Sequence, residues 1–264
     1  MYAFDYRRPS QLDEAVQACQ GDSRYLAGGQ SLVQAMKLRL SASEVLVDLG
    51  ALPGLADITL AEERIRVGAM ARHAEVARSA LVRERLPALA ELAEGIGDPM
   101  VRSMGTLGGS LANADPAACY PAALLALGAT VHTTSRSIAA DDFFTGLYGT
   151  ALEPGELITS VSFPVLQRAA YVKFKQPASR FALVGVMVAQ GPSAVRVAVT
   201  GAKDCVFREL ALEAALNREF SAQAAKACRV PEVDLLSDLH ASAAYRAAMI
   251  PVMAARAVER ALSR

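Results

Sequence analysis

Two pairs of adjacent glycines, each followed closely by a serine, are the residues of this chain best suited to hold a ligand. They read Gly28-Gly29-Gln30-Ser31 and Gly108-Gly109-Ser110. Glycine has no Cβ, so backbone N–H groups at these positions can come close to a ligand. A helix that begins beside such amides adds unpaired N–H groups and a dipole that both attract anions. The two segments therefore predict one phosphate-rich ligand that is held from two sides.

Neither glycine pair belongs to a common nucleotide-binding motif. A P-loop would continue as GK[ST] and a Rossmann turn would read GxGxxG, and neither pattern occurs in the two segments. This argues against ATPases, kinases and Rossmann enzymes. It favours a pyrophosphate-containing cofactor held mainly by backbone N–H groups, whose charge-assisted hydrogen bonds contribute roughly 1.5–3 kcal/mol each. On spacing alone, a structural turn explains either segment equally well.

A strand and a helix flank the first glycine pair. Residues 24–27 favour a short strand, and residues 32–40 place apolar side chains on one helical face, with Ser31 available to cap the helix. The second pair comes after helical sequence that ends at Gly95. Because the run from Asp98 into that pair holds many helix breakers, we expect it to form an ordered loop.

Further helices and strands are predicted along the chain. Residues 52–64 are expected to connect the predicted strands at residues 45–49 and 65–69. Periodicity and β-branched residues predict helices and strands at the following positions: helices 11–19, 117–127, 208–217, 222–228 and 243–262, and strands 45–49, 65–69, 129–134, 157–163, 170–175, 182–189 and 194–200. Pro251 is expected to kink or divide the last helix. The last three strands predict an antiparallel sheet packed by helices.

Composition narrows the classes of function. The 264 residues carry 27 Lys and Arg against 27 Asp and Glu, a balance that argues against a nucleic-acid partner. The longest weakly polar run, residues 117–131, is shorter than a bilayer span. The first ten residues lack the order of a signal peptide, which favours a cytoplasmic protein. Four cysteines and three histidines lie far apart in the sequence, which predicts neither a zinc site nor an iron–sulfur cluster.

The two glycine segments resemble a known family. LAGGQSLVQAMKLRL and IGDPMVRSMGTLGGSLANADPAA are similar to two segments of the FAD-binding medium subunits of molybdenum hydroxylases, the group of carbon monoxide, xanthine, aldehyde and N-heterocycle dehydrogenases. GELITSVSFP and YVKFKQPASRFALVGV extend the resemblance along the chain. It implies an α+β fold: a PCMH-type FAD-binding domain of two α/β subdomains over residues 1–168, then a small domain over residues 169–264 with a three-stranded antiparallel sheet and helices.

The resemblance also implies which residues hold FAD. Two segments would wrap the pyrophosphate and ribityl chain, and single positions farther along would approach the rest of the cofactor. The residues implied are Leu26, Ala27, Gly28, Gly29, Gln30, Ser31, Leu32, Val33, Thr106, Leu107, Gly108, Gly109, Ser110, Asp115, Ile158 and Lys175. Neither a catalytic residue nor a metal ligand is implied.

Some of these positions leave alternatives open. Several family members carry an acidic residue where this chain has Cys119. Asp115 either binds an FAD hydroxyl or caps the next helix, with Pro116 at the first helical position. Lys173 rivals Lys175, because side chains two residues apart share a face of a strand but differ in depth. Phe181 is either a core residue or, like the nearby Tyr171, a limit on the access of a second substrate to the flavin.

The function implied by the resemblance is electron transfer in an oxidoreductase complex. A large partner subunit with a molybdenum cofactor would hydroxylate the substrate, and a small partner subunit with two [2Fe–2S] clusters would relay electrons to FAD. NAD⁺, oxygen or a quinone would accept them, and the assembly would be a dimer of heterotrimers. The alternatives are a self-sufficient FAD oxidoreductase and a non-catalytic nucleotide-binding module.

Overall fold

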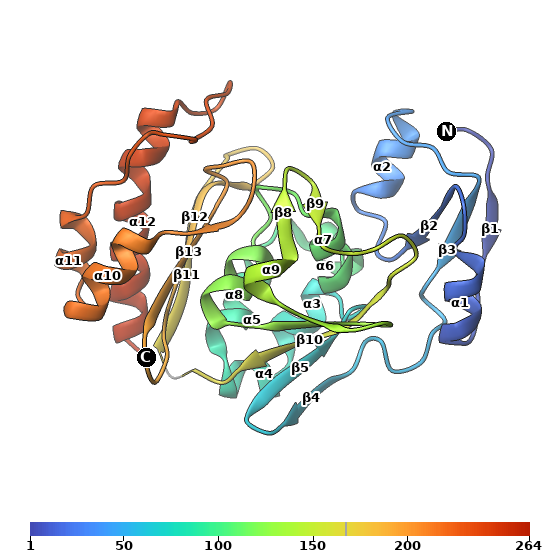
Figure 1. Cartoon of the computed structure of the whole chain (residues 1–264), viewed down its shortest axis with the longest axis horizontal. Coiled ribbons are helices and arrows are strands. Elements are labelled where there is room, and N and C mark those ends of the chain that lie inside the picture. Colours follow the sequence, from blue (N-terminus) through green and yellow to red (C-terminus); the bar gives the residue numbers. More distant parts are fainter. Residues whose placement is uncertain (167) are drawn as a thin grey trace.

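The first 48 residues form a parallel three-stranded sheet with a helix in each connection. The computed structural model describes residues 1–166 and 168–264, and Figure 1 shows this unit at one end of the molecule. Its strand order is β1-β3-β2. The elements are β1 (Asp5–Arg7), α1 (Leu12–Ala18), β2 (Ser23–Leu26), α2 (Leu32–Lys37) and β3 (Val45–Asp48). The β-branched and apolar β3 is central, which is where a parallel strand is most deeply covered.

An antiparallel five-stranded sheet forms the middle of the molecule. Its order is β4-β5-β10-β6-β7. The strands are β4 (Ile58–Ala61), β5 (Arg64–Gly68), β6 (Thr130–Thr133), β7 (Ser137–Ala139) and β10 (Ile158–Pro164). The segment expected to be a simple connection, residues 52–64, contains β4, which pairs with β5 across a tight turn. That prediction was wrong because an exposed edge strand has too little burial to produce a clear pattern.

Short helices complete the middle unit, and several of them contact this sheet. They are α3 (His73–Arg78), α4 (Ala80–Arg85), α5 (Pro87–Glu94), α6 (Pro99–Met104), α7 (Leu107–Asn113), α8 (Tyr120–Leu127) and α9 (Ala140–Phe143), with a small hairpin of β8 (Phe144–Gly146) and β9 (Gly149–Thr150). All eight residues of α8 are buried. Since it is apolar on every side, α8 forms the centre of the largest hydrophobic cluster.

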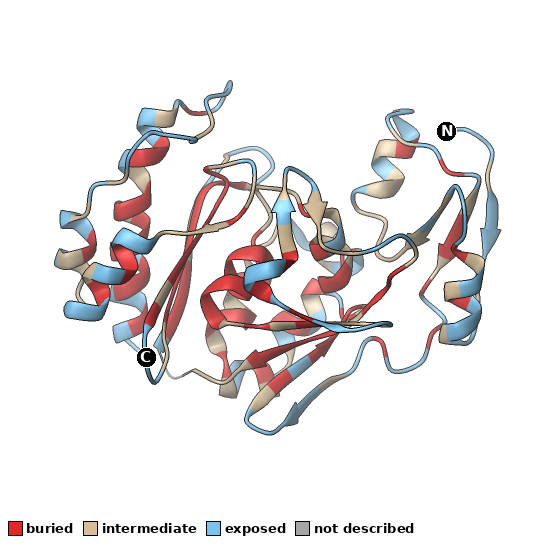
Figure 2. Cartoon of the chain, viewed as in Figure 1, coloured by how far each residue is buried: buried red, intermediate tan, exposed pale blue. Residues whose placement is uncertain are grey.

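The C-terminal unit is an antiparallel sheet covered on both faces. Its strands, in the order β11-β12-β13-β14, are β11 (Arg168–Lys175), β12 (Ala182–Gln190), β13 (Val195–Thr200) and β14 (Phe207–Arg208). The helices are α10 (Leu210–Arg218), α11 (Ala222–Ala227) and α12 (Ala243–Leu262). Figures 1 and 2 show the strands, largely buried, between α12 on one side and α8 on the other. The three predicted strands are present, and two residues of β14 extend the sheet.

Two expectations about helices need correction. Pro251 does not divide the last helix, because it lies inside α12, which is a single helix from Ala243 to Leu262. The run from Asp98 into the second glycine pair is not a loop, because α6 and α7 occupy it. Asp98 caps α6 by accepting a hydrogen bond from the N–H of Val101 at 2.9 Å, with a proline in the first turn. This cap and proline are helix-start signals that outweigh the glycines after them.

Among the residues that the structure describes, three hydrophobic clusters form the core. The largest lies in the middle unit, and the second lies between the C-terminal sheet and α12. The third, under the N-terminal sheet, holds seven buried residues, and one of them, Leu157, comes from the edge of the middle unit. Within the described residues, no helix is long and apolar enough to cross a bilayer.

Candidate functional site

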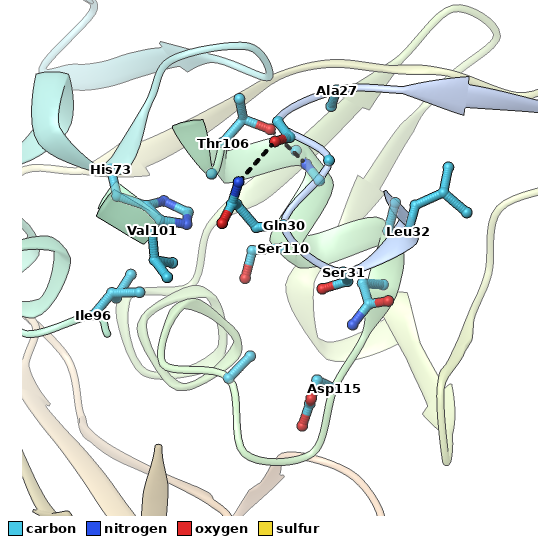
Figure 3. Close-up of a pocket in the computed structure, with 18 of the residues that line it drawn as sticks. Ala27, Gln30, Ser31, Leu32, His73, Ile96, Val101, Thr106, Ser110 and Asp115 are labelled. Atoms are coloured by element: carbon cyan, nitrogen blue, oxygen red, sulfur yellow. Dashed lines mark hydrogen bonds between the residues drawn. The ribbon is translucent and has the colours of Figure 1, made fainter. Parts of the chain in front are cut away.

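One cavity of about 930 Å³ opens between the two glycine segments. Its volume falls in the range of sites that bury a cofactor-sized ligand. Figure 3 shows residues of both segments facing the same space. The predicted residues that line it are Ala27, Gly28, Gly29, Gln30, Ser31, Leu32, Thr106, Gly108, Gly109, Ser110, Asp115 and Ile158. The lining of the cavity does not include Leu26, Val33, Leu107 and Lys175.

The two glycine segments touch through their backbones. A Cβ on Gly28 would lie 2.1 Å from the carbonyl oxygen of Met104 and 2.8 Å from the Cα of Gly105. A Cβ on Gly109 would lie 3.5 Å from that of Ala27. Atoms with no covalent bond between them do not approach as closely as 2.1 Å, so only glycine fits at position 28. The sequence pattern thus produces a direct contact between segments about 75 residues apart.

The first segment turns sharply at Gly29 before it enters α2. Gly29 has a φ of +69°, a left-handed conformation that favours glycine. Leu26 and Val33 pack behind this turn, where a Cβ on Gly29 would meet them at 3.5 and 2.9 Å. Their role is therefore to support the turn. Ser31 precedes α2 as expected, but its side chain accepts no capping hydrogen bond, so that part of the prediction was wrong.

The second segment is the first turn of α7. Thr106 is the N-cap, and its Oγ1 accepts a hydrogen bond from the N–H of Gly109 at 3.2 Å. The N–H of Gly108 donates to the carbonyl of Ala69 at 2.7 Å. A Cβ on Gly108 would lie 2.6 Å from the Cβ of Ala69. Glycine therefore lets α7 begin directly against the end of β5, while Leu107 is buried in the core.

Asp115 lines the cavity but does not cap α8. Its Oδ1 accepts a hydrogen bond from the N–H of Ala117 at 2.8 Å. The helix begins later, at Tyr120, with Pro121 in its first turn. The alternative of a helix cap with Pro116 at the first helical position was therefore wrong. The carboxylate holds a local turn in the cavity wall and is available to a ligand hydroxyl.

Lys173 lines the cavity, and Lys175 lies elsewhere. The Lys173 ammonium donates to the carbonyl oxygen of Arg180 at 2.8 Å and lies 3.3 Å from the thiol sulfur of Cys119. A register shift in the pairing of β11 with β12 falls between Phe174 and Lys175. Lys175 is exposed and lines only a second cavity of about 320 Å³, to which Lys173 also contributes. The geometry therefore favours Lys173 as the lysine that can reach a ligand.

His73 is a cavity residue that the sequence did not single out. Its side chain is 5% exposed, and its Nδ1 has no hydrogen-bond partner. The ring packs on that of Tyr120 with centroids 5.4 Å apart. Burial, assisted by the charge of Arg102, lowers the pKa of His73 to about 4, so its ring is neutral at pH 7. Figure 3 shows it near Val101.

Glu156 anchors the turn that leads into Ile158. Its side chain is 2% exposed and accepts hydrogen bonds from Arg136 Nε and Nη2, both at 3.1 Å, from Thr133 Oγ1 at 2.7 Å and from the N–H of Glu153 at 2.8 Å. These bonds, with the Arg136 bonds dominant, lower the pKa of Glu156 from 4.5 to about 2. The carboxylate is thus held ionised at the cavity wall.

We expect Glu156→Gln to lower the free energy of unfolding at pH 7 by about 1–3 kcal/mol, because it removes charge-assisted bonds from a buried group. Since the folded pKa is below the unfolded one, the contribution is complete above about pH 4.5 and disappears as the pH falls through about 2. Urea unfolding at pH 7, 5 and 3 measures this. The exposed Glu84→Gln is the control, and a wild-type advantage that grows toward pH 3 contradicts the prediction.

Among the residues that the structure describes, no group of three or more His, Cys, Asp or Glu side chains is placed to hold a metal ion. The charged and titratable groups of the lining include Lys173, Arg24 and Arg180, the carboxylates of Asp115 and Glu156, and the neutral His73. Such a lining suits a large ligand with phosphates in its middle.

Comparison with known proteins agrees with a large ligand that contains phosphates. Residues 2–166 match the family model described as the FAD binding domain in molybdopterin dehydrogenase. The chain is 35% identical to the nicotine 6-hydroxylase medium subunit of Paenarthrobacter nicotinovorans, over 99% of this chain and 98% of the relative. It is also 35% identical to the carbon monoxide dehydrogenase medium chain of Afipia carboxidovorans, over the same shares of the two chains.

Solved structures share the whole architecture. A chain of quinoline 2-oxidoreductase from Pseudomonas putida 86 superposes with a TM-score of 0.89 at 30% identity, covering 99% of this chain and 98% of that one. A chain of the cyanide-inactivated Cu,Mo carbon monoxide dehydrogenase superposes with the same TM-score at 33% identity, covering 98% of each chain. These similarities extend through the C-terminal unit as well as the cavity.

Proposed function

The chain belongs to the FAD-binding medium subunits of the molybdenum hydroxylases, and we propose that it transfers electrons from [2Fe–2S] clusters of a partner subunit to an external acceptor. FAD is its cofactor, and its class is that of the oxidoreductases. When bound, FAD supplies the redox chemistry, while the protein supplies placement and electrostatics.

The observation that supports this proposal most directly is the backbone contact of the two glycine segments across one cavity. No side chain beyond hydrogen fits at Gly28 or Gly108, and residues of both segments line the space between them. We propose that residues 26–33 and 106–110 hold the pyrophosphate and ribityl chain. Within these ranges Leu26, Val33 and Leu107 support the backbone from behind. Asp115 is placed to accept a hydrogen bond from an FAD hydroxyl.

The two aromatic ends of FAD need different surroundings. The lining near Lys173 also includes Cys119 and Phe181, and we assign the isoalloxazine to this region, where the ammonium can stabilise negative charge on the ring. The lining around His73 is otherwise aliphatic, with Ile96 and Val101, and we assign the adenine to it. The backbone of Ile158 contributes to the same cavity. In this assignment Lys173 replaces Lys175 as the lysine at the flavin.

The proposed partners follow from the names of the relatives. Both relatives described above are medium subunits or chains, which supports a large partner with a molybdenum cofactor and a small partner with [2Fe–2S] clusters. A dimer of such heterotrimers, an acceptor such as NAD⁺, oxygen or a quinone, and a cytoplasmic location remain predictions. We also propose the division into domains 1–168 and 169–264. The end of the matched FAD-binding model at residue 166 and the separate C-terminal cluster support it.

We expect the purified chain, after incubation with FAD and removal of the excess, to absorb near ~450 nm, where only the flavin contributes. At a hundred times its dissociation constant, FAD would add about 2.7 kcal/mol of stability. For a chain of this size that corresponds to a rise in melting temperature of roughly 5–10 °C. Thermal melts with and without FAD measure this.

The outcomes separate the alternatives. A colourless protein with an unchanged melting temperature contradicts FAD binding and supports a nucleotide-binding module of another kind. Reduction of the flavin by a substrate in the isolated chain supports a self-sufficient oxidoreductase. Co-purification of two partner chains, one with molybdenum and one with iron–sulfur clusters, supports the electron-transfer subunit.

A further inference from the structure

Arg246 is a buried charged residue far from the glycine segments. It lies on α12 and is 2% exposed. Its guanidinium donates to the carbonyl oxygens of Leu183 at 2.6 Å, Leu236 at 3.0 Å and Gly201, and to the carboxylate of Asp238 at 2.6 Å. A planar guanidinium with five N–H donors can join several segments in this way, which a lysine ammonium cannot match. Arg246 therefore fixes three segments of the C-terminal unit to one point.

Two of those segments carry aromatic rings that pack on each other, and one of the two, Phe181, lines the cavity. Phe181 lines the cavity and lies two residues before Leu183. His240 lies two residues after Asp238, whose Oδ1 accepts a hydrogen bond from the N–H of His240 at 2.8 Å. The two rings stand edge to face, with centroids 5.3 Å apart. Both rings are thus held by backbone that the same guanidinium fixes.

The position of the ring pair is tied to the region assigned to the flavin. The carbonyl of Arg180, next to Phe181, accepts a hydrogen bond from Lys173. Gly201, whose carbonyl bonds Arg246, donates its own N–H to the carbonyl of Pro116 at 2.8 Å. Pro116 follows Asp115 in the cavity wall. The guanidinium is therefore connected to one side of this region through the hydrogen bonds of Gly201, and to the other through the backbone between Leu183 and Arg180.

We propose that Arg246 is a positioning residue that holds Phe181 and His240 together as a barrier at the edge of the cavity, and that this pair limits the access of bulky external acceptors to the flavin. The inference rests on the proposed function. A buried arginine is costly to desolvate, and an apolar side chain would fill a core position at lower cost. Positioning the two rings at the cavity edge is the role that accounts for a charged residue at this buried position.

The test compares variants of the full-length chain loaded with FAD and reduced. The variants are Phe181→Ala, His240→Ala, Arg246→Lys and the double variant Phe181→Ala with Arg246→Lys. The readouts are the FAD dissociation constant and the ratio of the reoxidation rate by 2,6-dichlorophenolindophenol to that by dioxygen. In both reactions two electrons and two protons leave the reduced flavin, and the dye is much larger than dioxygen, so the ratio compares the access of a bulky acceptor with that of a small one. Arg256→Lys, an exposed arginine on the same helix, is the matched control.

We expect Phe181→Ala, His240→Ala and Arg246→Lys each to raise this ratio by about two- to tenfold. The loss of one aromatic pair contact shifts the equilibrium from a covered toward an open cavity edge by a factor of this size. Arg256→Lys should leave it unchanged. In the Phe181→Ala background, Arg246→Lys should add nothing, because no ring pair remains to be positioned. A purely structural Arg246 would instead raise the ratio further in that background.

Two results overturn the inference. One is an unchanged ratio in His240→Ala, an exposed residue whose loss does not threaten the fold. The other is an additive effect of Arg246→Lys in the double variant. In both cases FAD binding by the variants leaves the proposed function standing. Failure of the wild-type chain itself to bind FAD would be a failure of the proposed function instead.

Discussion

Replacing Gly28 by alanine should raise the dissociation constant for FAD by about ten- to a hundredfold. The new methyl group would lie 2.1 Å from the carbonyl oxygen of Met104 and 2.8 Å from the Cα of Gly105. Both neighbours are backbone atoms, so no side-chain rotation can relieve the clash. Overpacking a fixed site costs about 1–3 kcal/mol, and here the two glycine segments must separate to accommodate it.

Titration of the apoprotein with FAD, followed by flavin absorbance, measures the effect. Gly95→Ala is the matched control, because a Cβ there would meet the carbonyls of Glu91 and Leu92 at an ordinary 3.4 Å. The control should bind FAD as the wild type does. If Gly28→Ala also binds with wild-type affinity while its circular dichroism is native, the contact between the segments is not what shapes the site.

Replacing Lys173 by methionine should lower the midpoint potential of the bound flavin, whereas Lys175→Met should leave it unchanged. The Lys173 ammonium lines the cavity and would stabilise the negative charge of the reduced ring. Loss of one nearby charge, worth about 1–2 kcal/mol, corresponds to roughly 20–45 mV in a two-electron couple. Methionine keeps most of the length and apolar volume, so the change in charge dominates.

The two lysines provide a stringent internal comparison. They lie two residues apart on β11, and both are partly accessible to water, Lys173 half-buried and Lys175 exposed. Potentiometric titration of both FAD-loaded variants gives the midpoint potentials. An equal or larger shift in Lys175→Met would show that the register of β11 does not select the lysine at the flavin, and it would restore Lys175 to that role.

Much of the fold could be predicted because its signals are local. Helix α12 has apolar residues at helical spacing over twenty positions, and its predicted and observed bounds coincide at Ala243 and Leu262. The long strands of the C-terminal sheet are rich in valine and alanine and are buried on both faces. Short edge strands escaped prediction, because β7 and β14 gain their hydrogen bonds only from partners that fold beside them.

The glycine segments show which features of the site could be predicted from the sequence and which could not. Their composition correctly selected residues that line one cavity, but the second pair was assigned to a loop. Glycine in a helix costs only about 1 kcal/mol, and the Thr106 cap together with packing against Ala69 offsets that cost. A count of helix-breaking residues in the sequence does not include the stabilisation that such tertiary contacts provide.

Individual side-chain contacts between distant positions could not be predicted. Lys173 and Cys119 lie 54 residues apart, and Arg246 and Leu183 lie 63 apart. The choice between Lys173 and Lys175 depends on a register shift next to Phe174, which strand periodicity does not reveal. His73 depends on burial behind Gly105, which no local pattern indicates.

The small core beneath the N-terminal sheet has a consequence for how the subunit matures. Seven buried residues form that core; only Ala15, Cys19 and Val47 come from the first 48 residues, and Leu157 is contributed by the middle of the molecule. A unit with so little buried surface is marginal by itself, and its first glycine segment forms a wall of the cofactor cavity. We therefore expect the N-terminal unit to finish folding only when FAD binds. In the cell, flavin supply would then determine how fast newly made chains become competent to join their partners.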